Sequence, residues 1–347
     1  MVKKICAPVG VQIELTEQCN FHCFYCYNFW EDSKKTSPIG LKLSLDNIRL
    51  IMQQVFLNKI PVVTITGGEP FMNKEALFLI VELAQHHGVS VSINTNFSLV
   101  QETDLIKISS ITNNVSFLVS LPSANKYKYV KITKSSEYLY EKVIKNVKTA
   151  LGLGFKVSIN MVLTKVNMDS LEETAQLSKT LGIRTFCATK ALPNISFPSN
   201  RDFLLNTSEA IESINRIDEI SQKIGLSVDI LGCYPKCLLI KSNAFSKFLN
   251  RSCVAGCTTL TIGADGNVRP CSHMDKSYGN VFQESLKEIW DKMDDWKMDK
   301  FVPKECFGCL LFSTCRGGCR VNNPTNDLCK IDDYTDVNYL KLNESKI

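Results

Sequence analysis

The sequence predicts an α/β fold, in which a parallel sheet flanked by helices is followed by a small cysteine-rich domain with a β-hairpin. Two observations lead to this prediction. Six short apolar segments alternate with amphipathic segments in the first 190 residues, a pattern typical of β/α units that build a parallel sheet. Eight of the fifteen cysteines then gather in the last hundred residues. At 347 residues, the chain is long enough for one large core and a smaller appended domain.

The β/α units are predicted one by one from their local patterns. The first strand, Gly10 to Leu15, alternates apolar and polar residues, and Ser44 is a typical N-cap for the helix that follows, to about Asn58. The later elements are predicted in the same way. Strands are expected at 62–66, 89–94, 115–121, 155–163 and 183–188, and helices at 74–87, 138–151, 170–181 and 208–224.

Composition and charge exclude several classes of protein. The hydrophobic fraction of 44% is that of an ordinary globular chain, and the net charge of +5 comes from scattered lysines, which argues against a nucleic-acid partner. No apolar run approaches the roughly 20 residues of a membrane span, and the N-terminus has no secretory pattern. We therefore expect a cytoplasmic protein with no membrane contact. Cytosolic thiols stay reduced, so the cysteines indicate metal or redox chemistry and not a disulfide framework.

A short loop after the first strand holds Cys19, Cys23 and Cys26 in a C-x3-C-x2-C run. A closed structural zinc site needs four protein ligands, whereas three thiolates on a cubane iron–sulfur cluster leave one iron open. A zinc knuckle is the alternative. The run, with Tyr25 at its aromatic position, resembles the signature of the radical S-adenosylmethionine (SAM) enzymes. The resemblance implies that the open iron binds SAM and that the sheet is a partial (β/α)6 barrel, with its catalytic loops at the carboxyl ends of the strands.

A second loop, Gly67-Gly68-Glu69-Pro70, follows the second strand. Two glycines without a Cβ would let the backbone approach a ligand, and Glu69 supplies a carboxylate acceptor. In the enzymes that this chain resembles, such a loop holds the amino group of SAM. The same resemblance places four polar residues near the strand ends against the methionine and ribose parts of SAM, although each alone is equally a loop cap: Asn94, Asn96, Ser120 and Asn160.

The C-terminal cysteines form a ladder with defined spacing. Four residues separate Gly266 from Cys271, and a C-x2-C-x5-C-x3-C run with one last cysteine follows. The Asp265-Gly266 pair between short apolar segments predicts a tight hairpin turn. The ladder resembles the SPASM domain of radical SAM peptide-modifying enzymes. This resemblance implies two fully ligated auxiliary clusters, the first on Cys253, Cys257, Cys271 and Cys319 and the second on Cys306, Cys309, Cys315 and Cys329.

Together with the cluster expected at the N-terminal loop, the resemblance implies three [4Fe-4S] clusters in the chain. For the C-terminal cysteine ladder, the alternative is two zinc sites with four cysteine ligands each. Four cysteines receive no role: Cys6, Cys187, Cys233 and Cys237. The chain is predicted to divide into a radical SAM barrel at 1–190, a bridging region at 191–249, a SPASM domain at 250–335 and a tail at 336–347.

The resemblance also implies a reaction. Reductive cleavage of SAM gives a 5′-deoxyadenosyl radical that abstracts a hydrogen atom, so Cys19, Cys23 and Cys26 are the expected catalytic residues. The leading substrate is a ribosomally made precursor peptide, cross-linked through a thioether or carbon–carbon bond. The first alternative is a sulfatase-maturing enzyme, which oxidises a cysteine or serine to formylglycine. Enzymes of that kind have an aspartate next to the cysteine that corresponds to Cys271, whereas this chain has Ser272 there. A non-catalytic iron–sulfur electron carrier is the second alternative, and the expected SAM-binding loop argues against it.

The resemblance also implies protein partners. The cleavage of SAM needs an electron, which we expect from flavodoxin or ferredoxin. Because the first strand begins near residue 10, we expect the leader of the peptide to be bound by a separate protein or by the barrel rim.

Overall fold

The protein is described by a computed structural model over residues 5–28, 40–196, 200–323, 325, 327–336 and 338. Apart from 336 and 338, the tail predicted at 336–347 lies outside these residues. None of the described helices is both long enough and apolar enough to cross a membrane.

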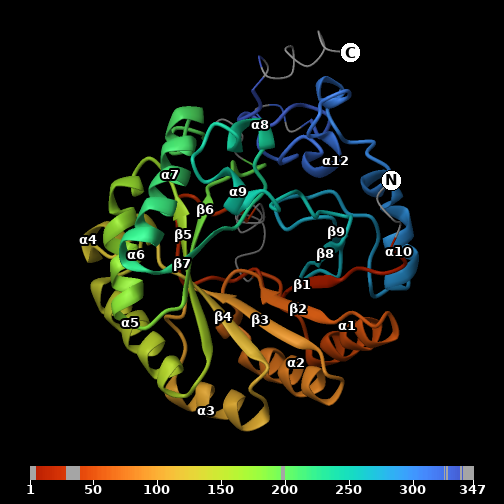
Figure 1. Cartoon of the computed structure of the whole chain (residues 1–347). Coiled ribbons are helices and arrows are strands. Elements are labelled where there is room, and N and C mark those ends of the chain that lie inside the picture. The colour runs from red at the N-terminus through yellow and green to blue at the C-terminus, as the bar shows by residue number, and fades with distance from the viewer. Residues whose placement is uncertain are drawn as a thin grey trace.

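One twisted sheet organises the molecule (Figure 1). Among the described residues it has nine strands in the order β7-β6-β5-β4-β3-β2-β1-β8-β9. All neighbours are parallel except β8 and β9. The first six strands are neighbours in sequence order, which confirms the six predicted β/α units. The strands are β1 (Gly10–Glu14), β2 (Val62–Thr66), β3 (Ser90–Thr95), β4 (Val115–Ser120), β5 (Lys156–Leu163), β6 (Thr185–Lys190), β7 (Ser227–Ile230), β8 (Thr259–Ile262) and β9 (Val268–Arg269).

The longer helices lie around the outside of the sheet (Figure 1). Ser44 caps the first of them as the sequence predicts, accepting a hydrogen bond from the Asn47 N–H, and Asn206, which was not predicted as a cap, forms a capping box with Glu209. These helices are α1 (Leu45–Leu57), α2 (Lys74–His86), α3 (Glu102–Ile111), α4 (Lys126–Thr133), α5 (Glu137–Gly152), α6 (Leu171–Thr180) and α7 (Thr207–Ile224).

Shorter helices occupy loops and the C-terminal region. They are the α-helices α8 (Lys236–Leu239), α9 (Phe245–Phe248), α10 (Leu286–Lys292), α11 (Asp294–Lys297) and α12 (Phe312–Cys315), and the 3-10 helices η3 (Pro70–Met72), η4 (Met168–Ser170) and η5 (Lys304–Cys306).

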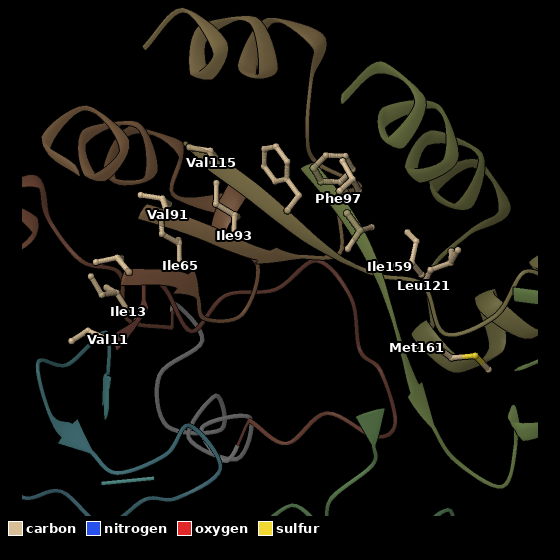
Figure 2. Close-up of a cluster of buried hydrophobic side chains, with 14 of the residues drawn as sticks. Val11, Ile13, Ile65, Val91, Ile93, Phe97, Val115, Leu121, Ile159 and Met161 are labelled. Atoms are coloured by element: carbon tan, nitrogen blue, oxygen red, sulfur yellow. The ribbon is translucent and has the colours of Figure 1, made fainter. Parts of the chain in front are cut away.

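The main core lies between the sheet and its outer helices. Alternate residues of the strands point to the helices, and Figure 2 shows Val11, Ile13, Ile65, Val91 and Ile93 among them, all essentially buried. The intervening residues therefore face the concave side of the sheet. This alternation leaves the polar side chains near the strand ends available to line a cavity.

Two outer helices were not predicted. Helix α3 has a short buried stripe, and α4 interleaves lysines with the buried residues Tyr129, Ile132 and Thr133. In α4 these residues stand at helical spacing, but the lysines between them hide the stripe in the sequence.

The predicted hairpin forms, and it joins the same sheet. Gly266 occupies the turn with a φ of +81°, as the Asp-Gly pair predicts. Strand β8 pairs in parallel with β1, so that Gly10 lies opposite Thr259. Arg269 of β9 also makes a buried ion pair with Glu14 of β1. The cysteine-rich region is therefore attached directly to the barrel sheet, and the region predicted as a bridge (191–249) adds β7 at the opposite edge.

Candidate functional site

The loop that carries Cys19, Cys23 and Cys26 follows β1 and rests against the end of α4. The N–H of His22 donates to the Thr133 carbonyl at 3.1 Å, and within the loop the Cys26 N–H donates to the Cys23 carbonyl at 3.0 Å. All three cysteines line one cavity of about 220 Å³ at the carboxyl ends of the strands. The structure thus brings the three predicted catalytic thiols together at the edge of the sheet where the parallel strands end.

A polar network that the sequence did not reveal holds the start of this loop. The Asn96 side chain donates to Asn20 Oδ1 at 2.9 Å and lies 4.0 Å from the Cys19 sulfur. Asn20 donates in turn to Ser98 Oγ at 2.9 Å, and Ser98 donates back to Asn96 Oδ1 at 2.7 Å. Asn96, predicted as a SAM contact, therefore also positions the cysteine loop.

The second predicted loop is bound to the residues that lead into the cysteine loop. Gly68 N–H donates to the Thr16 carbonyl at 2.6 Å, and Glu69 N–H donates to the Gln18 carbonyl at 2.7 Å. A Cβ on Gly68 would lie 2.0 Å from the Gln18 oxygen, and one on Gly67 would lie 2.5 Å from the Thr16 oxygen. The glycines therefore let this loop approach the chain's own backbone, and because both also line the cavity, their expected role beside a ligand stays a prediction.

Glu69 is buried at the centre of this arrangement. Its carboxylate accepts hydrogen bonds from the Thr95 hydroxyl at 2.6 Å, the Asn96 N–H at 2.8 Å and the Phe71 N–H at 3.1 Å. Burial is the largest influence on this group and raises the pKa of Glu69 to about 7, although the three hydrogen bonds oppose it. A cationic group in the cavity would favour the ionised carboxylate.

The predicted SAM-site residues converge on this cavity with one exception. Pro70 begins the 3-10 helix η3 and is not among the lining residues. Asn160 Oδ1 accepts from the Thr189 hydroxyl at 2.6 Å, which fixes its direction on the concave face. The predicted residues that line the cavity are Cys19, Cys23, Tyr25, Cys26, Gly67, Gly68, Glu69, Asn94, Asn96, Ser120 and Asn160.

Two aromatic residues at this site were not predicted. The rings of Tyr27 and His273 stack with their centroids 4.0 Å apart, and both line the cavity. Burial lowers the pKa of His273 to about 4, so its imidazole is neutral at pH 7. His273 comes from the cysteine-rich region, whereas Tyr27 follows the N-terminal loop. This contact between distant segments left no signal in the local sequence.

A second cavity of about 420 Å³ continues from the first. The two share lining residues on the concave face of the sheet, among them Asn94, Leu118 and Asn160. Four thiols line the second cavity: Cys233, Cys253, Cys271 and Cys319. The N-terminal cysteine loop and the cysteine-rich region therefore border one continuous space.

Three of the four cysteines assigned to the first auxiliary site line this cavity, and Cys257 lines a neighbouring pocket together with Cys253. Cys257 accepts a hydrogen bond from Arg316 at 3.0 Å and lies 3.2 Å from the Trp296 carbonyl. In the second assigned set, Cys306, Cys309 and Cys315 line a small pocket together with Cys237, whereas Cys329 is exposed. The assignment of these eight ligands stays a prediction.

A buried ion pair supports the wall between these thiols and β6. Lys190 lies 3.3 Å from Asp332, and both side chains are at most 1% exposed. Asp332 also accepts the Cys319 N–H at 2.7 Å, so the pair fixes the backbone at one of the thiols. Sequence reasoning missed both residues, because an ion pair across 142 positions leaves no local pattern.

The residues around the two cavities fit the groups that the sequence suggests. Thiolates are the ligands that iron–sulfur clusters require, and the cysteines of the N-terminal loop face the cavity that contains Glu69. Asn28 also lines it, and its buried Oδ1 accepts no hydrogen bond from any described residue. Among the described residues no disulfide joins any two cysteines, and no three Cys, His, Asp or Glu side chains are placed to hold a single metal ion.

Comparison with known proteins identifies two domains. Residues 13–178 match the radical SAM superfamily, and residues 253–310 match the SPASM iron–sulfur cluster-binding domain. A protein of Methanosarcina acetivorans named "Probable GTP 3′,8-cyclase" is 28% identical over 285 residues, which are 81% of this chain and 82% of that protein. One of the same name from Saccharolobus islandicus is 26% identical over 302 residues, 83% of this chain and 93% of that protein.

Solved structures show the same fold at low sequence identity. Streptococcus suis SuiB bound to S-adenosylmethionine aligns with a TM-score of 0.76 and 18% identity, covering 97% of this chain and 78% of SuiB. Native anSMEcpe with bound AdoMet aligns with a TM-score of 0.70 and 19% identity, covering 97% of this chain and 95% of that chain. Both likenesses extend through the cysteine-rich region.

Proposed function

Because the chain belongs to the radical SAM superfamily and carries a C-terminal SPASM domain, we propose that it modifies a ribosomally made precursor peptide. The product is a thioether or carbon–carbon cross-link at an unactivated carbon. The observation that carries this proposal is the continuity of the two cavities. A peptide segment in the larger cavity would lie between the N-terminal cysteine loop and the thiols of the SPASM domain.

The chemistry divides between a cofactor and the chain's own residues. Cys19, Cys23 and Cys26 would hold a cluster with one open iron, which would supply the electron for the reductive cleavage of SAM. Glu69 and the strand-end residues Asn94, Ser120 and Asn160 line the cavity and would hold and orient SAM there.

The electron balance of a thioether cross-link sets a further requirement. The substrate loses two hydrogen atoms overall as the new carbon–sulfur bond forms. One leaves as the new C–H bond of 5′-deoxyadenosine, and the other leaves as a proton and an electron. The reaction therefore needs a one-electron donor for SAM, such as flavodoxin or ferredoxin, and a one-electron acceptor of the iron–sulfur class. The two auxiliary clusters, each with four thiolate ligands, match that class.

The charges around the larger cavity favour a peptide over a nucleoside triphosphate, which the names of the sequence relatives suggest as the second candidate. Among the described lining residues, the lysine and arginine side chains already have partners. Lys190 pairs with Asp332, and Arg251 pairs with Asp229. Arg320 donates to the carbonyls of Gly317 and Gly318 at 3.0 and 3.3 Å. A triphosphate carries several negative charges and would have to displace these partners.

Formylglycine formation is the other reaction on a peptide. Ser272 is buried beside Cys271, and a serine hydroxyl is a poor general base compared with the aspartate expected in such enzymes. The site thus favours cross-linking. A separate leader-binding protein stays part of the proposal.

The test uses the anaerobically reconstituted chain with SAM, dithionite and one candidate substrate at a time. A precursor peptide encoded beside the gene should raise 5′-deoxyadenosine formation at least tenfold and lose two hydrogen atoms by mass spectrometry. GTP should do neither. Stimulation by GTP with no change in the peptide would overturn the proposal in favour of the nucleotide reaction. A new aldehyde on the peptide, detected with a carbonyl-selective reagent, would instead indicate formylglycine chemistry, because a serine loses two hydrogen atoms and a cysteine exchanges its sulfur for oxygen in that reaction.

A further inference from the structure

We propose that the segment from Cys233 to Cys237 supplies one thiolate ligand to each of the two auxiliary clusters, in place of Cys257 and Cys329. The proposal rests on the auxiliary clusters of the proposed function and not on its peptide substrate. It gives a role to two cysteines outside the ladder that defines the SPASM resemblance.

The wall of the second cavity places Cys233 among the ligands of one site. Cys233 lines this cavity together with Cys253 and Cys319. Cys271 lines the same cavity as these three. The four thiols come from four separate segments, which gives a complete four-thiolate set of the kind that a [4Fe-4S] cluster uses.

The second site has a matching arrangement around Cys237. Cys237 lines one pocket with Cys306, Cys309 and Cys315. The Lys236 N–H donates to the Cys315 sulfur at 3.2 Å, and the Asp336 N–H donates to the Cys237 sulfur at 3.3 Å. Backbone N–H groups directed at cysteine sulfurs are the contacts that tune cluster thiolates.

The two sites are joined by a pair of segments with identical spacing. Cys233 and Cys319 line one cavity, while Cys237 and Cys315 line another pocket, so Cys233-x3-Cys237 and Cys315-x3-Cys319 run side by side in opposite directions. The segments pack tightly between these thiols, and a Cβ on Gly318 would lie 2.8 Å from Pro235. Each segment therefore directs one thiol into each site.

The two displaced cysteines have other surroundings. Arg316 donates to Cys257 and also pairs with Asp299, which holds Cys257 on the far side of Cys253. Cys329 is exposed, and its sulfur lies 3.9 Å from the Lys300 carbonyl. With Cys233 and Cys237 in place, each site reaches four thiols without either of them.

Iron content of the reconstituted full-length chain tests the proposal by substitution. Cys233→Ala and Cys237→Ala should each lower iron by about four atoms per chain, while Cys257→Ala and Cys329→Ala should keep the wild-type value. Cys187→Ala, at a buried thiol of β6, is the matched control and should also keep it. Loss of iron in the Cys257 and Cys329 variants, with full iron in the Cys233 and Cys237 variants, would overturn the proposal.

A second measurement on the wild-type chain covers the case in which a variant does not fold. Iodoacetamide treatment and peptide mapping compare the reconstituted protein with the same protein after chelation of its iron. Cys233 and Cys237 should become reactive only after iron removal, while Cys257 and Cys329 should react equally in both states. Protection of Cys257 or Cys329 by iron would overturn the assignment of the corresponding site. Neither readout depends on any substrate, so this proposal and the peptide proposal can fail separately.

Discussion

Replacing Gly68 by alanine tests how the glutamate loop is built. Gly68 is the cleaner of the two glycines, because Gly67 has a φ of +134° and would be strained by any side chain. At Gly68 the obstacle is the Gln18 carbonyl oxygen, 2.0 Å from the new Cβ. The loop must move away, which breaks its two backbone hydrogen bonds to Thr16 and Gln18.

The magnitude follows from those contacts. Two lost hydrogen bonds cost about 1–3 kcal/mol, and forcing a methyl group into a packed site costs a similar amount. We expect the free energy of unfolding of the apoprotein to fall by about 2–6 kcal/mol in Gly68→Ala. The affinity for SAM should fall as well, because Glu69 moves with the loop.

Urea unfolding and equilibrium dialysis of SAM measure the two effects. Gly152→Ala is the matched control, since it ends α5 with nothing within 4 Å of the new Cβ. Alanine there should leave SAM binding unchanged and stabilise the fold by up to about 1 kcal/mol. A Gly68→Ala protein with the wild-type unfolding midpoint and SAM affinity would refute the close approach of the two loops.

Three further predictions concern the same site. Burial raises the pKa of Glu69 from 4.5 to about 7, so the folded apoprotein keeps a proton that the unfolded chain releases. The free energy of unfolding of the apoprotein should therefore fall by about 3 kcal/mol as the pH rises from below 4.5 to above 7. Glu69→Gln should remove that part of the pH dependence in urea unfolding. An unchanged pH profile in this variant would contradict the raised pKa of Glu69. Asn20→Ala removes two side-chain hydrogen bonds and should cost about 1–3 kcal/mol by the same assay, whereas no loss would show that the network does not hold the loop. Changing Cys19, Cys23 and Cys26 together to alanine should lower iron from about twelve to about eight atoms per chain by elemental analysis, and unchanged iron would exclude a cluster there.

The sheet could be predicted from local patterns because each β/α unit carries its own signal. Apolar residues at Val62, Val63 and Ile65 define a strand, and Ser44 defines the start of a helix. The pairing of β8 with β1 joins residues about 250 positions apart, and no local pattern encodes such a pairing. Strand β7 was absent from the prediction for another reason, because its four residues include only two buried positions and give a weak local signal.

The candidate site likewise has features that local sequence patterns predict and features that they do not. The spacing of the N-terminal cysteines and the Gly-Gly-Glu-Pro loop are visible in the sequence, and the structure brings them to one cavity. The Asn20–Asn96–Ser98 network, the stacked pair of Tyr27 and His273, and the proximity of Cys233 to Cys319 depend on tertiary packing. The spacing of the C-terminal cysteines could not show which of them bind the two auxiliary clusters, because Cys233 and Cys237 are available in addition to the eight of the ladder.

The most direct measurement of the central claim is deuterium transfer. The anaerobically reconstituted chain is given SAM, dithionite and a precursor peptide deuterated at its aliphatic carbons, and 5′-deoxyadenosine and peptide are analysed by mass spectrometry. We predict deuterium in the 5′-deoxyadenosine and a peptide that has lost a deuterium at carbon and one further hydrogen, with neither change in Cys19→Ala. Unlabelled 5′-deoxyadenosine beside an unmodified peptide, with turnover of GTP by the same preparation, would contradict a peptide-modifying function.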